Sequence, residues 1–321
     1  MARTRRPAVT AVSLNTALDR TLELTRLTPG RVHVTARELE SAGGKAVNAA
    51  RVLASLGLVA RVVGLAGGAA GRRARALARA EGLRATWVAT AGESRVCTVL
   101  VDPEHGATVI NGRGPEVAAS ELAALERAAL ARAARGDALV LAGSLPPAVP
   151  EDVYAVWTRR ARAAGAPLVA LDAHGPPLAA ALSAAPDIVK VNREEFAALG
   201  PDVSLAAIAG RLLAGGVGLV VVTQGSEGAL AFTRDGVWRA EAARVRACNA
   251  TGSGDAFLAA LVAGRLEGRH VPEALALATA AGALNAERLE PGVPGRPQVE
   301  ALAGRVDVRA VPASYPALGG R

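Results

Sequence analysis

The sequence is poor in aromatic side chains and has no long apolar run. Three Phe, three Trp and two Tyr occur in 321 residues, so Ala, Leu and Val must fill the core. The 51% of hydrophobic residues is ample for a sizeable core. No apolar run approaches the roughly 18 residues that would span a bilayer, and the run from Val9 to Leu14 is too short for a signal-peptide core. We therefore expect a cytoplasmic protein without a membrane partner.

Cysteine and histidine are also scarce. Cys97 and Cys248 lie far apart in the sequence, which suggests reduced thiols. Neither belongs to a Cys/His spacing that would bind a metal. The four histidines lack the spacing of metal ligands or of a catalytic triad. These absences argue against a Cys/His metal site and against a disulfide scaffold.

Lysine is nearly missing, although the chain is basic. Of 37 basic residues, only Lys45 and Lys190 are Lys. The net charge of +8 suits anionic small molecules. The arginines are scattered over expected helix faces without aromatics for base stacking, so we expect no nucleic-acid partner. A composition that uses Arg almost everywhere should keep Lys where a compact point charge is required, which marks both lysines as candidate functional residues.

Short apolar runs alternate with Ala/Leu/Arg-rich helical stretches, a pattern typical of a mostly parallel sheet with crossover helices. Expected strands are 60–65, 138–142, 168–171, 188–191 and 219–223. Expected helices are 46–56, 72–81, 120–134, 151–164, 205–214, 255–265 and 272–288. No internal repeat or long linker interrupts them, so one main α/β domain is expected.

Two segments, 9–38 and 95–111, break this alternation. Both read as β-rich, with polar residues at alternate positions. They could pair into a small sheet beside the main one, or each could supply an ordinary edge strand. The pattern alone does not choose between these two arrangements.

The hexapeptide ATGSGD, from Ala250 to Asp255, precedes an apolar helix. Small residues at 252–254 allow a tight turn that aims backbone N–H groups at one point, and the helix N-terminus adds its positive end there. Such a turn can stabilise a transferring phosphoryl group, and Asp255 can accept a proton from an attacking hydroxyl. An Asp in a first helical turn should have a low pKa. The alternative is an ordinary glycine-rich helix start.

The segment SAGGKAVN, from Ser41 to Asn48, combines glycines that allow close backbone approach with Lys45 and Asn48 on one helix face. It is not a Walker A loop, because Leu39 and Ala46 stand where Gly and Ser or Thr are required. The sequence GSGDAF is not a dinucleotide fingerprint either, since Phe257 replaces the third glycine. These two nucleotide-binding motifs are therefore excluded.

Polar groups also follow four expected buried strands. They are Ser144, Asp172, the pair Asn192 and Glu195, and the loop TQGSEG at 223–228. Because ligands of open parallel sheets bind outside the carboxyl ends of the strands, these groups should line one crevice. Each alone could be a turn or a helix cap.

The set AGGKAVN, GSLP, VNREE and ATGSGD resembles the ribokinase/PfkB family of carbohydrate kinases, in the same order and over about residues 9–290. The opening SLNTALD, the pair Ser94–Arg95 and GSLPPAVPEDVY resemble the family's sugar-phosphate kinase branch. The resemblance implies a ribokinase-like fold over 9–304 with a β-rich lid at about 14–40 and 95–112. Residues 1–8 would be disordered and 305–321 a C-terminal tail.

The resemblance also implies a role for each matched position. Asp255 corresponds to the catalytic base, and Gly252, Ser253 and Gly254 to the anion hole. The acceptor sugar phosphate would be bound by Asp19, Arg31, Gly43, Gly44, Lys45, Asn48, Arg95 and Ser144. ATP and Mg²⁺ would be bound by Lys190, Asn192, Glu195, Thr223, Gly225, Ser226, Gly228 and Asn285, with Glu195 acting on the metal indirectly, through Mg-ATP. The lid would also serve as a homodimer surface.

The leading hypothesis is phosphorylation of a ketohexose monophosphate, as in the conversion of fructose 1-phosphate to fructose 1,6-bisphosphate. This hypothesis rests on three cationic residues, Arg31, Lys45 and Arg95, because a site for a neutral sugar would not need them. Ala46, where the branch has Gly, puts the substrate more in question than the reaction. The alternatives are a kinase for an unphosphorylated sugar or nucleoside, and a catalytically silent sugar-phosphate sensor.

Overall fold

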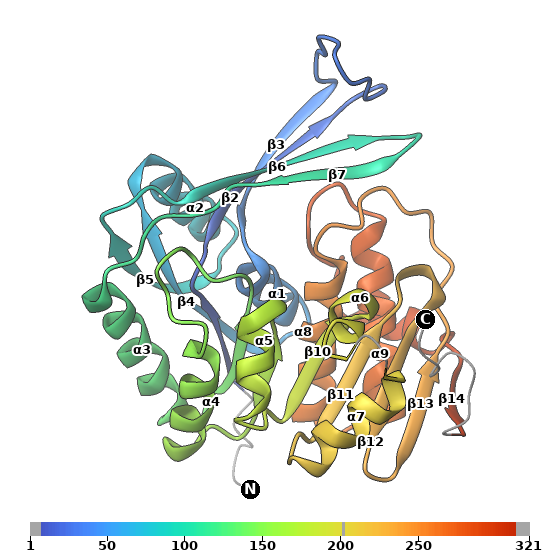
Figure 1. The fold of residues 1–321 in the computed structure, drawn as a ribbon. Helices are drawn as coiled ribbons and strands as arrows, with labels where there is room; N and C mark the ends of the chain where they lie inside the picture. The colour runs from blue at the N-terminus through green and yellow to red at the C-terminus, as the bar shows by residue number, and fades with distance from the viewer. Residues whose placement is uncertain (1–7, 201–202, 313–321) are drawn as a thin grey trace, which may run out of the picture.

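The computed structural model describes residues 8–200 and 203–312. Ten strands form the main sheet, in the order β14-β13-β12-β11-β10-β9-β8-β1-β4-β5 (Figure 1). In chain order they are β1 Ala8–Ser13, β4 Val59–Gly67, β5 Arg84–Thr90, β8 Ala138–Ala142, β9 Val169–Asp172, β10 Ile188–Asn192, β11 Leu219–Thr223, β12 Ala229–Thr233, β13 Gly236–Ala240 and β14 Val308–Val311. All pairings from β11 to β5 are parallel, whereas β12, β13 and β14 add antiparallel strands at one edge.

Helices cover both faces of this sheet, and each face has its own apolar core. The helices are α1 Lys45–Ser55, α2 Gly68–Ala80, α3 Ala119–Ala133, α4 Val153–Ala163, α5 Gly175–Leu182, α6 Arg193–Ala197, α7 Leu205–Ala214, α8 Ser253–Leu266, α9 Val271–Ala286 and α10 Arg296–Ala303. Helices α1, α8 and α9 supply one core, and α3, α4, α5 and α7 supply the other. The central strands are buried on both faces, which explains why they read as continuous apolar runs.

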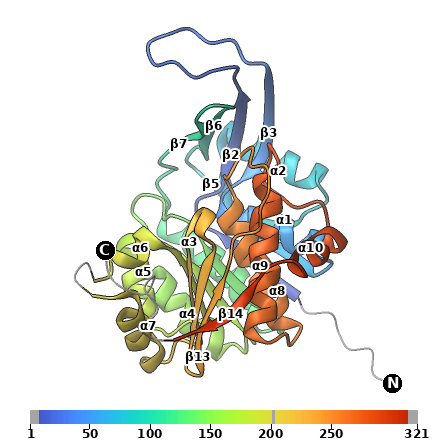
Figure 2. The ribbon, with the colours of Figure 1, turned by 90° about the vertical axis from the view of Figure 1, so that its right-hand side faces the viewer.

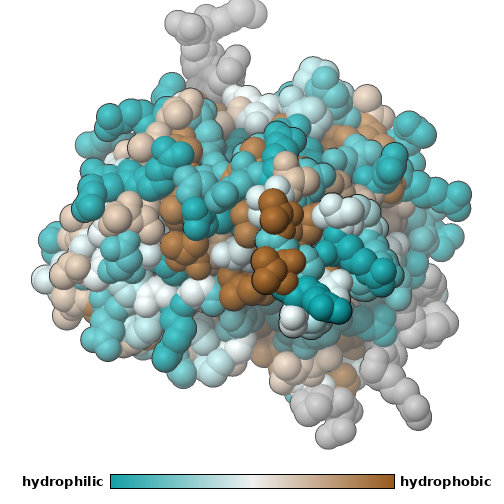
Figure 3. Space-filling view, turned by 90° about the horizontal axis from the view of Figure 1, so that it is seen from above, coloured by the Kyte–Doolittle hydropathy of each residue, from teal (hydrophilic) through white to brown (hydrophobic). Residues whose placement is uncertain are grey.

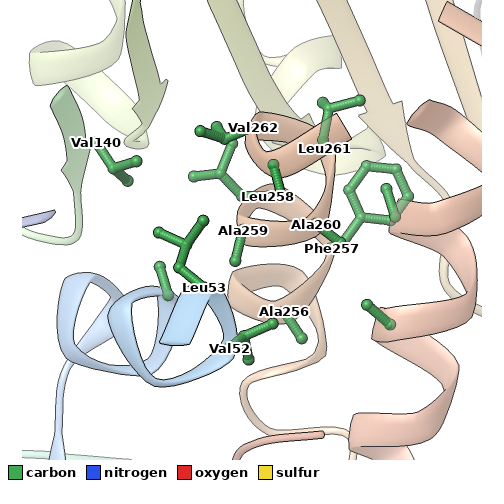
Figure 4. Close-up of a cluster of buried hydrophobic side chains, with 14 of the residues drawn as sticks. Val52, Leu53, Val140, Ala256, Phe257, Leu258, Ala259, Ala260, Leu261 and Val262 are labelled. Carbon is green, nitrogen blue, oxygen red and sulfur yellow. The ribbon is translucent and has the colours of Figure 1, made fainter. Parts of the chain in front are cut away.

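Helix α8 is buried on nearly every side. Ten of its residues, from Asp255 to Gly264, are buried, and they pack against Val52 and Leu53 of α1 and against the sheet (Figure 4). Small Ala residues in α8 and α9 allow this close approach, which compensates for the shortage of aromatics. The rigid packing fixes the N-terminus of α8 relative to α1, and this is the part of the fold that positions the site.

Apart from residues 9–13, which belong to β1 of the main sheet, the two β-rich segments pair into a separate sheet, which we call the lid. Its strand order is β3-β2-β6-β7, with β2 Ala17–Glu23, β3 Arg37–Gly43, β6 Arg95–Asp102 and β7 Gly106–Asn111. Strands β2 and β6 run parallel and join the two distant segments. The lid projects from the carboxyl ends of the main strands (Figures 1 and 2). Of the two arrangements left open by the sequence, the small separate sheet is confirmed.

The surface seen from the lid side is mostly hydrophilic, with hydrophobic side chains gathered near its middle (Figure 3). Among the described residues, the exposed large apolar side chains all belong to the lid, and are Val32, Val34, Val96, Val109 and Ile110. In the described ranges, no helix combines the length and apolarity that crossing a membrane requires.

The expected strands and helices are all present, with ends that differ by a few residues. The assignment of 305–321 to a tail is wrong for Val308–Val311, which pair with β13 as strand β14. Apart from Ala8, which begins β1, the segment expected to be disordered lies outside the described residues, as does the end of the tail. Strands β5, β12 and β13 and helices α5, α6 and α10 were not predicted.

Candidate active site

A cavity of about 670 Å³ lies between the lid and the carboxyl ends of the main strands. It brings together ten residues singled out from the sequence: Asp19, Gly44, Lys45, Asn48, Arg95, Ser144, Lys190, Gly252, Gly254 and Asp255. They come from the lid, from α1, from the end of β10, from the loop after β8 and from the turn before α8. The kinase hypothesis requires Asp255, Asp19 and Lys45 to face one another, and these three residues share this cavity.

The turn before α8 has free donors at the cavity. Gly252 adopts a left-handed conformation with φ 83°, which a side chain would strain. The N–H of Ser253 donates to the carbonyl of Ala250 at 3.1 Å, and that of Ala256 donates to the carbonyl of Gly252 at 2.9 Å. Of the first four N–H groups of α8, those of Gly254 and Asp255 are thus left without an acceptor in the described chain. They can bind an anion at the positive end of the helix.

Asp255 is buried at the first turn of α8, and its carboxylate accepts a hydrogen bond from Asn48 Nδ2 at 2.8 Å. Burial raises the pKa of Asp255 to about 6, against the opposing effect of the Lys45 ammonium. The expectation of a low pKa is wrong, because loss of hydration outweighs the helix dipole and the nearby cations. A carboxyl group with such a pKa is ionised near neutral pH and still able to accept a proton.

The two lysines meet at one carboxylate beside this turn. Lys45 Nζ binds Asp172 Oδ1 at 2.5 Å, and Lys190 Nζ binds Asp172 Oδ2 at 2.8 Å. Burial disfavours each charge, but the mutual attraction wins, so the pKa of Asp172 lies below its usual range and that of Lys45 above it. The Lys45 ammonium therefore stays charged. Any side chain at Gly254 would place a Cβ 2.7 Å from Lys190 Nζ, so glycine is needed there for the ammonium to approach the turn.

Asp19 lies at the lid end of the cavity. Burial raises the pKa of its carboxyl group to about 6, although Arg95 and Arg51 oppose this shift. A Cβ at Gly43 would collide with the Asp19 carboxylate, so glycine is required at this position of β3. Arg95 Nε donates to the carbonyl of Asn15 at 3.1 Å.

Ser144 follows β8 at the same end of the cavity. Its hydroxyl accepts a hydrogen bond from Asn15 Nδ2 at 3.2 Å. This end of the cavity thus joins a carboxylate, a guanidinium and a hydroxyl, which are groups suited to a phosphorylated polyol.

Asn192 and Glu195 form a reciprocal cap at the start of α6. Asn192 Oδ1 accepts from the N–H of Glu195 at 2.7 Å, and Glu195 Oε2 accepts from the N–H of Asn192 at 2.9 Å. The alternative that these residues form a helix cap is therefore correct for the local structure. The charge of the Glu195 carboxylate also helps to raise the pKa of Lys45, so the cap interacts electrostatically with the lysine in the cavity.

The loop after β11 lies beside this cap. Thr223 pairs with Asn192 in neighbouring strands, and residues 225–227 form a short 3₁₀ turn. Gly225 and Gly228 have φ of 57° and 94°, and any side chain at Gly228 would collide with the backbone of Ala240. These residues and Ser226 lie outside the cavity described above.

Comparison with known proteins decides the family. Residues 12–297 match the pfkB family carbohydrate kinases. The chain belongs to the pfkB family of carbohydrate kinases. A 1-phosphofructokinase from Xanthomonas campestris pv. campestris is 38% identical over 266 residues, covering 80% of this chain and 83% of that protein. A 1-phosphofructokinase from Escherichia coli (strain K12) is 30% identical over 308 residues, covering 94% of this chain and 98% of that protein.

Solved structures of pfkB-type kinases share the fold. Phosphofructokinase-2 from Escherichia coli, in complex with potassium, superimposes with a TM-score of 0.85 at 23% identity, over 94% of this chain and 99% of that one. Ribokinase from Thermotoga maritima gives a TM-score of 0.74 at 22% identity, over 94% and 100%. The ribokinase-like fold expected from the sequence is therefore confirmed.

Three predicted residues of this pfkB-family kinase stand differently from expectation. Arg31 lies on the exposed hairpin tip of the lid, outside the cavity. Asn285 does not line the cavity either, since its Nδ2 binds Thr251 O at 2.9 Å and Ser253 Oγ at 3.1 Å. Its Oδ1 accepts from the N–H of Gly292 at 2.8 Å, so Asn285 holds the turn before α8 in shape. The Ser253 hydroxyl accepts the hydrogen bond from Asn285, and its N–H donates to Ala250 O within the turn.

Ten further residues line the cavity and were not predicted: Cys97, Val99, Val109, Asn111, Gly112, Arg113, Leu145, Pro147, His174 and Thr251. Those on β6 and β7 face the cavity because alternate residues of a strand share one face. Once Arg95 is taken as a site residue, the same alternation in the sequence indicates that Cys97 and Val99 face the site. Arg113 and His174 lie in loops, and only the fold brings them to the site. No ion-pair partner of Arg113 occurs among the residues described.

Proposed function

We propose that this kinase transfers the terminal phosphoryl group of ATP to a hydroxyl of a ketohexose monophosphate, converting fructose 1-phosphate to fructose 1,6-bisphosphate. One observation carries the proposal. A single cavity holds a buried carboxylate beside an anion-binding turn, and Arg95 and Arg113 at its lid side. The carboxylate and the turn suit phosphoryl transfer, and the two arginines suit the binding of a phosphate that the acceptor already carries. The relatives that bear the name 1-phosphofructokinase support this substrate class.

Asp255 acts as the base in this proposal. Its buried carboxylate accepts the proton of the attacking hydroxyl as the new O–P bond forms and the bond to the leaving diphosphate breaks. The N–H groups of Gly254 and Asp255, with Lys190 beside them, neutralise charge that develops on the transferred group. Asp19 and Asn48 bind the sugar hydroxyls, with Gly43 leaving room for the Asp19 carboxylate and Gly44 for the ring. Because its ion pair with Asp172 holds Lys190 in place, the ammonium needs to move little when the phosphoryl group is transferred.

The nucleotide side uses Mg-ATP. In the described residues no group of three or more His, Cys, Asp or Glu could hold a metal ion. Mg²⁺ fits nonetheless, because it commonly keeps several waters and is held by phosphates and one or two carboxylates. Glu195, beside Asn192, is the carboxylate that would orient such waters. The phosphates and nucleoside would extend from Lys190 toward 223–228, where glycine backbone allows close approach. Bound Mg²⁺ would supply charge neutralisation between the two outer phosphates.

The test is a coupled ADP-release assay over a panel of sugars and sugar phosphates, with wild type and Arg95→Ala. We expect turnover of fructose 1-phosphate that exceeds turnover of fructose, ribose and adenosine. Loss of a charge-assisted contact in Arg95→Ala should lower kcat/KM by about tenfold to a hundredfold. Equal turnover of fructose and its phosphates would favour the kinase for an unphosphorylated sugar. No turnover of any acceptor would favour the sensor.

We also propose that the kinase works in the cytoplasm as a homodimer that pairs through its lid. Two free cysteines, Cys97 and Cys248, suit a reducing compartment. The exposed apolar lid residues include Val96 and Ile110, and apolar side chains on a projecting sheet suit burial against a second copy. Light scattering should give twice the chain mass for the wild type, and a lower mass for Ile110→Asp. An unchanged mass in that variant would exclude this surface.

A further inference from the structure

Arg51, on α1, is tied to three groups at the base of the lid. Its Nη1 donates to Asn48 Oδ1 at 2.8 Å, and its Nη2 donates to the carbonyl of Ala42 at 2.6 Å. Its Nε donates to Glu81 Oε2 at 2.6 Å. The side chain is 13% exposed, so these bonds are largely shielded from water. A guanidinium has five N–H donors in a rigid fork, which is what allows one side chain to engage three partners.

The contact with Asn48 fixes which way its amide points. A guanidinium only donates hydrogen bonds, so the atom of Asn48 that faces Arg51 must be Oδ1. Nδ2 then faces Asp255, where it donates to Oδ2 at 2.8 Å. With the amide turned over, Oδ1 would face the Asp255 carboxylate and Nδ2 would face the guanidinium. Both contacts would then be repulsive, so Arg51 selects the one orientation that suits an ionised Asp255.

The contact with Ala42 fixes the lid strand that carries the acceptor site. Ala42 precedes Gly43 in β3, and the backbone at Gly43 lies directly against the Asp19 carboxylate. Residues Ala42 and Gly43 also pair with Leu18 and Ala17, the two residues that precede Asp19 in β2. A single guanidinium thus joins the strand beside Asp19 to the amide beside Asp255.

We propose that Arg51 is a positioning residue, which holds the acceptor-binding Asp19 and the base Asp255 in register through Ala42 and Asn48. The proposal rests on the proposed function, since it takes Asp255 as the base and Asp19 as an acceptor ligand. Arg51 does not line the cavity and so acts through its partners. The competing account is that Arg51 only stabilises the fold by an ion pair with Glu81.

The control is Arg296, an arginine that also has three partners, in its case a carbonyl and two carboxylates. Its Nε donates to Leu56 O at 2.6 Å and its Nη1 to Glu267 and Glu300 at 3.2 Å, remote from the cavity residues. The variants to compare are Arg51→Gln, Arg51→Lys, Arg296→Gln and Arg296→Lys. Lysine keeps the charge but its single ammonium cannot span three partners. If Arg51→Gln fails to fold, Arg51→Lys decides.

The first measurement is a carbon-13 NMR titration of the Asp255 carboxyl group, assigned with Asp255→Asn. Lys45 on α1, Asp172 on β9 and Lys190 on β10 are the charged groups that face Asp255, and all three are unchanged in these variants. We expect the pKa of Asp255, about 6 in the wild type, to rise in both Arg51 variants, because the Asn48 amide can then turn its oxygen to the carboxylate. It should stay unchanged in both Arg296 variants.

The second measurement is kcat/KM for the best acceptor. Both Arg51 variants should lose about tenfold to a hundredfold, as for a lost hydrogen bond to a charged group, mainly in kcat, with a matching shift of the acid limb of the pH profile. The Arg296 variants should change it by less than about twofold. An Asp255 pKa that is the same in all four variants overturns the proposal. If the wild type turns over no acceptor, the proposed function fails, and the titration still decides the role of Arg51.

Discussion

Lys45 and Lys190, the only lysines in the chain, bind opposite oxygens of one buried carboxylate, that of Asp172. Lys45 begins α1 and Lys190 lies in β10, so Asp172 at the end of β9 links the start of α1 to β10. The Lys190 ammonium lies so close to the turn that a Cβ at Gly254 would stand 2.7 Å from its Nζ, and a guanidinium is a larger head group than an ammonium. This gives a physical reason for lysine at that position in an arginine-rich protein.

Asp172→Asn should strongly destabilise the fold, because two buried ammonium groups lose their counterion. The expected loss in the free energy of unfolding is about 3–5 kcal/mol, measured by urea denaturation at pH 7.5. The pKa of Asp172 lies below its ordinary value, so the wild type should keep this stabilisation at pH above about 4 and lose it only as the pH falls further.

Glu104→Gln is the control for the Asp172 prediction, since it breaks the exposed ion pair with Arg26. It should change the free energy of unfolding by at most about 1 kcal/mol. A loss in Asp172→Asn no larger than that of the control would show that the two lysines do not depend on Asp172.

Much of the site could be predicted from the sequence, because its residues lie in short motifs at the ends of strands and the start of helices. ATGSGD predicted both the tight turn and the carboxylate, and SAGGKAVN predicted Lys45 and Asn48. The carboxyl ends of parallel strands meet at one sheet edge, so Ser144 could be placed there as well, while the rarity of lysine singled out Lys190. Local chemistry and topology agree at these positions.

Other features depend on three-dimensional neighbours and could not be predicted in the same way. The raised pKa of Asp255 follows from the packing of α8 against α1 and α9, which no local pattern reveals. Arg31 and Arg113 are both loop arginines, and only the fold shows that the second lines the cavity. The sequence alone does not distinguish whether Asn285 binds a ligand or stabilises a turn. Strand β14 joins the sheet through pairing with β13, far from it in sequence.

Gly254→Ala should lower kcat without a comparable rise in KM for the acceptor. The new Cβ would stand 2.7 Å from Lys190 Nζ, so the ammonium or the turn must move, and a displacement of about 1 Å can lower a rate roughly a hundredfold. Gly210→Ala is the control, because no described atom beyond its neighbours and its own helix backbone lies within 4 Å of its Cβ position and Ala favours a helix interior. Steady-state kinetics of both variants check this, and equal kcat values would contradict it.

Arg113→Ala should lower kcat/KM for the sugar phosphate by about tenfold to a hundredfold, as for the loss of a charge-assisted contact. Turnover of the corresponding unphosphorylated sugar should change far less, which separates phosphate recognition from general damage. Arg31→Ala, at the lid tip outside the cavity, is the comparison and should stay within about twofold of the wild type. A large effect at Arg31 with none at Arg113 would reverse the assignment.

The acid limb of kcat/KM should reflect two carboxyl groups. Burial raises the pKa of Asp255 and of Asp19 to about 6, so both are ionised above that pH and both gain protons below it. The rate should therefore fall below pH 6 with a slope greater than one, and Asp19→Asn should reduce that slope. The phosphate of the acceptor also titrates near pH 6, but it contributes equally to both enzymes. An unchanged slope in Asp19→Asn would show that Asp19 does not titrate in this range.

Asp255→Asn should make the protein more stable at neutral pH while it abolishes turnover. The pKa of Asp255 is about 6 in the fold against 3.8 for an ordinary Asp, so the native state binds the proton more tightly than the unfolded chain. Above pH 6 the buried charge therefore destabilises the fold, by up to about 3 kcal/mol. A neutral Asn removes that penalty and can still accept the hydrogen bond from Asn48.

The gain from Asp255→Asn should thus appear at pH 8 and vanish near pH 4, where the native wild type is already protonated at this position. Asp102→Asn is the opposite case, because backbone N–H groups of His105, Leu27 and Glu104 hold the pKa of Asp102 below its usual range, so it should lose stability at pH 8. Thermal unfolding of the three proteins at both pH values compares them directly. A melting temperature for Asp255→Asn that is below the wild type at pH 8 would mean that its hydrogen bond and cations stabilise the charge more than burial disfavours it.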